Sequence, residues 1–186
     1  MIRHFATEGN LSKRYIGVTD EPLSEFGKHK LKETDYPVVE AVFSSPLKRC
    51  VDTARLIYPN LVPMVLNNLA ECDFGDFENK NYMELKNNID YQAWIDSGGT
   101  LPFPKGEKLE AFKSRCIEGF HSAVKLSLQE GYLRIAMVVH GGTMMSILEK
   151  YSKPQKGYYH WQVENGNGYR MELDDDGRLI NLCDIL

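Results

Sequence analysis

The alternation of apolar and polar residues divides the chain into short buried strands and amphipathic helices. Val38–Phe43 and Arg134–Val139 are largely apolar and rich in β-branched residues, which is typical of strands buried on both faces. Val62–Leu69 is a further strand candidate, and Met1–His4 is predicted to be the end of a very short first strand. The last segment alternates around Asp176-Gly177, a dipeptide that favours a hairpin turn.

Apolar residues at spacings of three and four predict helices between these strands. The longest is predicted over Glu107–Glu130, where a single face is apolar. That face consists of Leu109, Phe112, Cys116, Phe120, Val124 and Leu128. The other principal helices are Ser24–Glu33, with Ser24 as its N-cap, Leu47–Ile57 and Thr143–Tyr151.

The segment from Ala70 to Lys105 is irregular and polar, with short helices predicted around Tyr82–Asn87 and Tyr91–Asp96. We interpret residues 74–106 as a short lid. Because strands and helices alternate along most of the chain, we predict an α/β protein with helices on both faces of a largely parallel central sheet. No repeat, low-complexity tract or linker interrupts the pattern, which indicates a single domain over residues 1–186.

Composition and charge narrow the range of partners and compartments. A net charge of −4 provides no basic field, so neither nucleic acid nor an anionic membrane is expected as a partner. The four cysteines lie far apart without a C-x-x-C pair, which favours reduced thiols over a zinc site or a disulfide framework. No apolar run reaches membrane-spanning length, and the N-terminus lacks the apolar region of a signal peptide. We therefore expect a cytoplasmic protein.

Chemically active side chains fall at the ends of four predicted strands. Arg3 and His4 follow the first strand and His140 follows Arg134–Val139. Arg49 lies in the first turn of the helix after Val38–Phe43, and Glu71 follows Val62–Leu69. In open α/β sheets ligands bind at the carboxyl ends of the strands, so these groups should converge. Guanidiniums that bind phosphate, an imidazole nucleophile and a carboxylic acid are what phosphoryl transfer needs.

Each of these residues alone also has an ordinary structural interpretation. A lone histidine is more often a hydrogen-bonding residue of the fold, and a lone arginine more often lies on the surface. His140-Gly141-Gly142 fits a tight turn, although a glycine turn that opens a helix is also an anion site. Asp174-Asp175-Asp176 lacks the ligand spacing of a calcium loop and is interpreted as a solvated turn, so no metal site is predicted.

Six segments of the sequence follow the order of the motifs of one known family. They are residues 3–10 (RHFATEGN), 15–24 (YIGVTDEPLS) with Gly27, 44–49 (SSPLKR) with Thr53 and Ala54, Glu71 with Phe74 and Gly75, 104–107 (PKGE) with Arg115, and 139–142 (VHGG). Through these matches the sequence resembles the histidine phosphatase superfamily, in its phosphoglycerate-mutase-like branch. The resemblance covers nearly the whole chain and implies the three-layer sandwich of that branch.

The resemblance also implies a role for each site residue. His4 matches the nucleophile and Glu71 the proton donor. The phosphate pocket would consist of Arg3, Arg49 and His140, with Asn10 as a further polar contact. Thr7 and Gly141 would support the loops that carry these groups, and neither a metal nor another cofactor is implied.

The sequence departs from the family pattern at three places. Phe5 replaces the glycine that follows the catalytic histidine, and Asn79 replaces the glycine usual after Phe74-Gly75. Met1 leaves only three residues before His4, where the family has a full strand, so we expect a truncated or misassigned start. None of these differences removes a catalytic group.

Three functions are compatible with this resemblance. The first is a metal-independent phosphomonoesterase that acts through phosphohistidine on a small phosphorylated metabolite. Arg14-Tyr15 and Thr19-Asp20 are similar to members that act on α-ribazole 5'-phosphate or on sugar phosphates. The second is a phosphoglycerate-type mutase, which the short segment after Glu71 disfavours. The third is a non-catalytic member of the fold, which should have lost site residues. The sequence is compatible with a homodimer and does not decide the oligomeric state.

Overall fold

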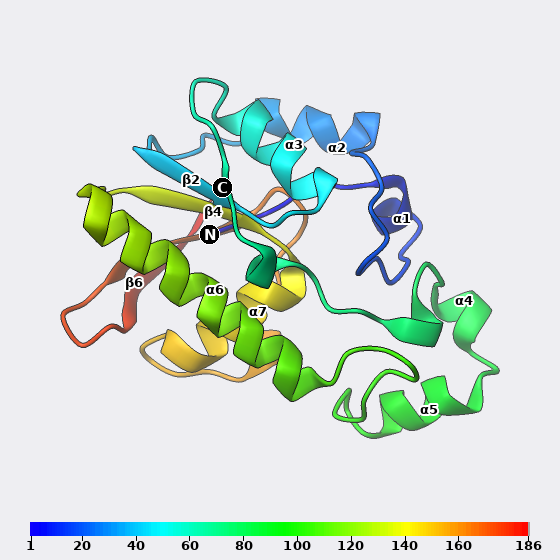
Figure 1. The fold of residues 1–186 in the computed structure, drawn as a ribbon. Coiled ribbons are helices and arrows are strands. Elements are labelled where there is room, and N and C mark those ends of the chain that lie inside the picture. The colour runs from blue at the N-terminus through cyan, green and yellow to red at the C-terminus, as the bar shows by residue number, and fades with distance from the viewer. Residues whose placement is uncertain (186) are drawn as a thin grey trace.

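The computed structural model describes residues 1–185 and contains one mixed sheet of six strands (Figure 1). The strands are β1 (Ile2–Arg3), β2 (Ala41–Ser44), β3 (Met64–Val65), β4 (Ile135–Val139), β5 (Gly168–Leu173) and β6 (Leu179–Ile185). Their order is β3-β2-β4-β1-β5-β6. The first four strands of this order are parallel, whereas β5 runs antiparallel to β1 and to β6.

Helices cover both faces of this sheet, as predicted. They are α1 (Glu8–Leu11), α2 (Glu25–His29), α3 (Lys48–Ile57), α4 (Tyr82–Leu85), α5 (Ile89–Asp96), α6 (Leu109–Glu130) and α7 (Gly141–Tyr151). Short 3-10 helices add Lys30–Lys32, Asn67–Leu69, Gly75–Phe77 and Tyr158–Trp161. In Figure 1, α2 and α3 lie on one face of the sheet, and α6 and α7 lie on the other. The short helices α4 and α5 lie away from the sheet, at the lower right of the view. The predicted three-layer α/β class is confirmed.

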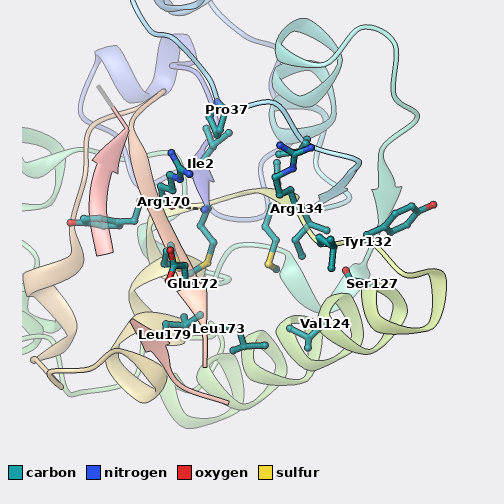
Figure 2. A pocket seen from close by; sticks show the side chains of 18 of the residues that line it. Ile2, Pro37, Val124, Ser127, Tyr132, Arg134, Arg170, Glu172, Leu173 and Leu179 are labelled. Atoms are coloured by element: carbon teal, nitrogen blue, oxygen red, sulfur yellow. Dashed lines mark hydrogen bonds between the residues drawn. The ribbon is translucent and has the colours of Figure 1, made fainter. Parts of the chain in front are cut away.

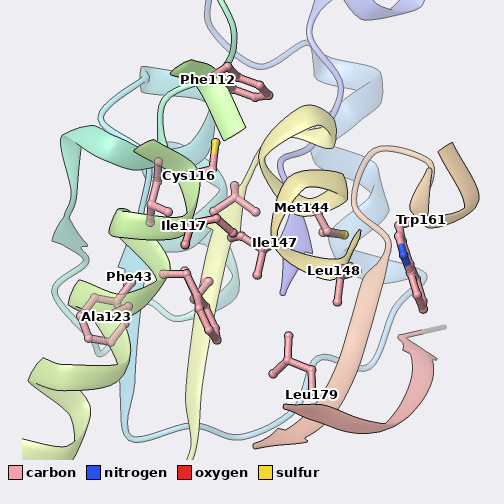
Figure 3. Close-up of a cluster of buried hydrophobic side chains, with 14 of the residues drawn as sticks. Phe43, Phe112, Cys116, Ile117, Ala123, Met144, Ile147, Leu148, Trp161 and Leu179 are labelled. Carbon is pink, nitrogen blue, oxygen red and sulfur yellow. The ribbon is translucent and has the colours of Figure 1, made fainter. Parts of the chain in front are cut away.

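The alternation of side chains along the strands creates two hydrophobic cores. On β4, Ala136 and Val138 belong to the core under α3, while Met137 and Val139 belong to the core under α6 and α7. Figure 3 shows the second core, in which Phe43 of β2 meets side chains of α6 and α7. Burial on both faces requires apolar residues at successive positions, which explains the continuous apolar runs of the central strands.

Three details of the predicted elements are wrong. The buried strand predicted at Val38–Phe43 begins only at Ala41, and Val38 is 78% exposed. Leu128 was placed on the buried face of the long helix, but its side chain is 73% exposed and Ser127 is buried instead. Over the 22 residues of α6, a strict spacing of four drifts off the buried face, because the helix has about 3.6 residues per turn. The predicted strand at Val62–Leu69 is also shorter, because only Met64–Val65 pair with β2 before the chain turns into the 3-10 helix.

A cavity of about 840 Å³ opens at the amino-terminal end of β4, far from the carboxyl ends of the strands (Figure 2). It lies between β4 and β5, because β1 separates these strands only over Ile2–Arg3. Val124, Ser127 and Tyr132 contribute to its wall. Among the described residues, no helix has the length and apolar character needed to cross a membrane.

Candidate active site

The structure brings the predicted catalytic side chains to the carboxyl ends of the parallel strands. Arg3 ends β1 and His4 follows it, while His140 follows β4 directly. Arg49 lies in the first turn of α3, which follows β2. Glu71 lies two residues after the 3-10 helix Asn67–Leu69 that follows β3.

His4 is buried and has one ring nitrogen without a backbone partner. Its Nδ1 lies 2.7 Å from the carbonyl oxygen of Phe5, an acceptor, so Nδ1 carries the hydrogen and Nε2 keeps its lone pair. Burial lowers the pKa of His4 well below 6.5, and the charges of Arg49 and Arg3 lower it further. The imidazole is therefore a neutral base with Nε2 as its nucleophilic atom.

Arg3 and Arg49 each keep one buried guanidinium nitrogen without a partner. Arg3 donates from Nη1 to the carbonyl of Val163 at 2.6 Å. Arg49, which is fully buried, donates from Nη1 and Nη2 to the carbonyls of Thr19 at 2.8 Å, Gly17 at 2.7 Å and Ile16 at 3.2 Å. Within residues 1–185 the Nε atoms of both arginines are buried and find no acceptor. Buried donors without an acceptor are rare in proteins, and a guanidinium donor is well suited to an anion.

His140 lies at the base of the site. It is the N-cap residue of α7, is fully buried, and its ring makes an edge contact with His4 at a centroid distance of 5.1 Å. Its Nε2 lies 2.6 Å from Ser45 Oγ. Burial and then Arg49 lower the pKa of His140 well below 6.5. Gly141 opens α7, and a Cβ atom at this position would lie 3.5 Å from Arg3 Nε, in ordinary van der Waals contact.

Glu71 is a buried carboxyl group with a raised pKa. Its oxygens accept hydrogen bonds from the backbone N–H groups of Cys72 at 2.9 Å and Gly142 at 3.1 Å. Burial raises the pKa above 4.5, although these bonds and the charges of Arg49 and Arg3 oppose the shift. Glu71 is thus biased towards the protonated form that can donate a proton.

Arg115 of α6 fastens the segment that carries Glu71. It donates to the carbonyls of Ala70 at 2.6 Å and Glu71 at 2.8 Å. Glu107 accepts two bonds of 2.7 Å from the same guanidinium, which fixes its plane. Both residues belong to the family motifs, which by themselves do not explain their presence. Their contacts supply the explanation.

The loop after His4 is held by Thr7, Asn10 and a residue that sequence reasoning missed. Thr7 and Asn10 form a capping box at the start of α1, with bonds of 3.2 Å in both directions. Asn165, distant in sequence, donates to the carbonyl of His4 at 3.0 Å and to Asn10 Oδ1 at 3.3 Å. It lies in an irregular polar stretch without periodicity, so no local pattern marks it.

The two substitutions of family glycines have simple structural explanations. Phe5 is fully buried and packs near Tyr36, with ring centroids 6.1 Å apart, and it does not line the cavity at the site. Asn79 has a φ of 55°, in the left-handed region where glycine is favoured and asparagine is tolerated. Neither side chain obstructs the catalytic groups.

A cavity of about 1070 Å³ opens over these residues. Arg3, His4, Asn10 and Glu71 line it, whereas Arg49 and His140 are fully buried in the wall behind. The segment 74–106 contributes aromatic side chains to the opposite wall, among them Phe74, Trp94 and Phe103. Tyr91 is instead buried within this segment, and Tyr82 is 58% exposed. The described residues include no cluster of three or more histidine, cysteine or carboxylate side chains suited to a metal ion.

A three-layer α/β fold with imidazoles, guanidiniums and a carboxyl at its strand ends defines a phosphoryl-transfer class of enzyme. The family model described as "Histidine phosphatase superfamily (branch 1)" matches residues 1–185. The chain therefore belongs to the histidine phosphatase superfamily. The sequence-based prediction of this family, and of a phosphoric monoester hydrolase as the class of enzyme, is confirmed.

Curated relatives within the family carry different activities in their names. The adenosylcobalamin/alpha-ribazole phosphatase of Escherichia coli (strain K12) is 27% identical over 175 residues, covering 89% of this chain and 85% of that protein. The 2,3-bisphosphoglycerate-dependent phosphoglycerate mutase 2 of Gloeobacter violaceus is 31% identical over 160 residues, covering 80% of this chain and 72% of that protein.

Solved structures show the same fold. The alpha-ribazole phosphatase from Shigella flexneri superposes with a TM-score of 0.82 at 24% identity, over 97% of this chain and 93% of that one. The phosphoglycerate mutase from Thermus thermophilus gives a TM-score of 0.68 at 26% identity, over 97% of this chain and 95% of that one.

We expect His4 to be neutral at pH 7, with hydrogen on Nδ1 and none on Nε2. A free imidazole titrates near pH 6.5, whereas the pKa of His4 is lowered well below that value. Nitrogen-15 correlation spectra of the imidazoles, with His4 assigned from the His4→Gln spectrum, should show this tautomer unchanged from pH 8 to 6.5. Protonation of His4 within that range, or a hydrogen on Nε2, would contradict the geometry.

Proposed function

We propose that the protein is a metal-independent phosphomonoesterase that acts through a phosphohistidine at His4 on a small phosphorylated metabolite. The observation that carries this proposal is the free Nε2 of His4 beside the unpartnered Nε atoms of Arg3 and Arg49. Both guanidiniums are close enough to lower the pKa of His4. A nucleophile beside buried donors that have no acceptor fits the binding of a phosphate group.

In the first step Nε2 of His4 attacks phosphorus in line with the leaving oxygen. A nitrogen–phosphorus bond forms and the phosphorus–oxygen ester bond breaks, while Arg3, Arg49 and His140 stabilise charge on the remaining oxygens. Asn10 lines the cavity and is a further polar contact for the phosphate. Glu71 gives its proton to the leaving oxygen, and its raised pKa supports this role.

In the second step the roles of Glu71 reverse. Its carboxylate takes a proton from water, the water oxygen bonds to phosphorus, and the nitrogen–phosphorus bond breaks to restore neutral His4. Inorganic phosphate leaves and Glu71 is again protonated. The hydrogen bonds from Cys72 and Gly142 keep the carboxyl group in one place through both steps.

The aromatic side chains in the wall of the cavity support a substrate with a partly flat leaving group. Trp94 and Phe103 lie with ring centroids 5.3 Å apart, and Tyr15 makes an edge contact with Trp94. α-Ribazole 5'-phosphate is therefore our first candidate, supported by the name of the Escherichia coli relative, and a sugar phosphate is the second. A panel of phosphate monoesters, assayed without added metal, tests this choice.

His4→Ala should abolish turnover, lowering kcat by roughly 10⁴-fold or more, because the variant lacks the imidazole that accepts the phosphoryl group. Radiolabel from a phosphorylated substrate should appear on the wild-type protein as an acid-labile, alkali-stable adduct and be absent from the variant. Hydrolysis at a near-wild-type rate by His4→Ala would refute the proposed nucleophile.

Glu71→Gln should slow poor leaving groups by roughly 10²-fold or more and p-nitrophenyl phosphate far less, because a good leaving group scarcely needs a proton. Wild-type kcat/KM for poor leaving groups should fall as pH rises through the raised pKa of Glu71, where the acid is lost. This alkaline limb should disappear in the variant. Equal slowing of both substrates would show that Glu71 is not the acid.

Transfer to an acceptor should be a small fraction of turnover, because the cavity over His4 is open to water. Adding 2-phosphoglycerate should leave the release of inorganic phosphate nearly unchanged. Simultaneous measurement of released phosphate and phosphorylated acceptor distinguishes the two activities. Transfer that exceeds hydrolysis at saturating acceptor would instead assign the mutase activity named for the Gloeobacter violaceus relative.

A further inference from the structure

We infer that Glu78 is a positioning residue for the phosphate site, acting through the loop of residues 16–20 and Arg49. The inference rests on the proposed function, because it assigns Arg49 to phosphate binding. Glu78 follows the 3-10 helix Gly75–Phe77 at the root of the lid and does not line the catalytic cavity. Glu78 therefore acts on the site indirectly, through the backbone of the loop to which both Glu78 and Arg49 are hydrogen-bonded.

The loop of residues 16–20 is held from two sides by charged side chains. On one side Arg49 donates to the carbonyls of Ile16, Gly17 and Thr19. On the other side Oε1 of Glu78 accepts the N–H groups of Gly17 at 2.8 Å and Thr19 at 2.9 Å. Gly17 and Thr19 therefore each accept a hydrogen bond from Arg49 at the carbonyl and donate one to Glu78 from the N–H group.

This arrangement determines where the remaining donor of Arg49 points. The Nη atoms are occupied by loop carbonyls, so the position of the loop fixes the plane of the guanidinium. Nε is the donor left for an anion. A shift of the loop would therefore turn Nε away from the phosphate position, and hydrogen bonds at such sites depend strongly on direction.

Close packing leaves the loop few alternative positions. A Cβ atom at Gly17 would lie 2.0 Å from the carbonyl oxygen of Cys72 and 2.8 Å from Glu78 Oε2, so only glycine fits there. Asp20 accepts the backbone N–H of Lys48 at 2.7 Å, which ties the same loop to the first turn of α3. Arg49 is the next residue of that turn, so the loop contacts both its side chain and its helix.

Glu78 also connects the phosphate site to the lid. Its Oε2 accepts the N–H of Phe74 at 3.3 Å, and Phe74 lines the catalytic cavity. The backbone N–H of Asn79, at the lid root, donates to the carbonyl of Tyr15, the residue before the loop, at 2.8 Å. The Glu78 carboxylate thus links the backbone of the lid to the loop that holds Arg49, so a movement of the lid at Phe74 would also move this loop.

The test uses three substitutions of Glu78 in the full chain and one matched control. Glu78→Ala removes the acceptor. Glu78→Asp keeps the charge but shortens the reach by one methylene. Glu78→Gln keeps an oxygen that accepts the N–H groups of Gly17 and Thr19, but it loses the charge and the acceptor for the N–H of Phe74. Glu84→Gln is the control, since Glu84 is a lid carboxylate that pairs with Arg14 at 2.9 Å outside this loop. Measurements are kcat and KM for p-nitrophenyl phosphate, the inhibition constant of inorganic phosphate, and thermal unfolding.

We expect Glu78→Ala and Glu78→Asp to weaken inhibition by phosphate about tenfold and to lower kcat, because Ala has no acceptor and Asp is too short to reach the N–H groups of Gly17 and Thr19. Glu78→Gln should retain phosphate inhibition within about threefold, and Glu84→Gln should match the wild type. If Glu78→Ala fails to fold, the comparison of Asp with Gln decides the question.

Three outcomes would overturn the inference. One is a lowered unfolding temperature with unchanged phosphate inhibition, which would make Glu78 a purely structural residue. Another is equal damage from Asp and Gln, and the third is an equal loss in Glu84→Gln. Wild-type phosphohistidine formation, measured in the same preparation, tests the proposed function separately from Glu78.

Discussion

The properties of this site depend on one physical condition, the burial of its charged and titratable side chains away from water. Arg49 is fully buried, a state that costs several kcal/mol unless strong hydrogen bonds compensate. Three backbone carbonyls supply that compensation and leave Nε free. The same burial lowers the pKa values of His4 and His140 and raises that of Glu71. One physical cause therefore favours a neutral nucleophile and a protonated acid together.

Backbone groups, rather than side chains alone, hold this site in place. The carboxyl group of Glu71 is held by two N–H groups, and Arg115 donates to the backbone carbonyls of Ala70 and Glu71. Glu78 and Arg49 hold one loop from opposite sides. Substitution cannot remove a backbone carbonyl or, with the exception of proline, a backbone N–H group. The geometry of the site can therefore be altered only through the side chains that bind these groups.

The family motifs and the apolar runs predicted the parts of the molecule that depend on local sequence. The central strands follow from burial on both faces, and α3, α6 and α7 follow from apolar spacing. The carboxyl ends of parallel strands meet at one edge, so the sequence alone predicted that His4 and His140 lie together. Leu128 shows where spacing fails, since small rotations per turn accumulate along α6 and move the residue to the surface.

The sequence by itself determined the class of fold, the family and the set of chemical groups, because periodicity, strand-end position and motif order are all local properties. Only the tertiary structure decided what those groups do to one another. Asn165 reaches His4 from 161 residues away, and Glu78 and Arg49 meet the same loop from opposite sides. Burial, and with it the direction of each pKa shift, arises when distant segments pack together and exclude water, and no local pattern records which segments those are.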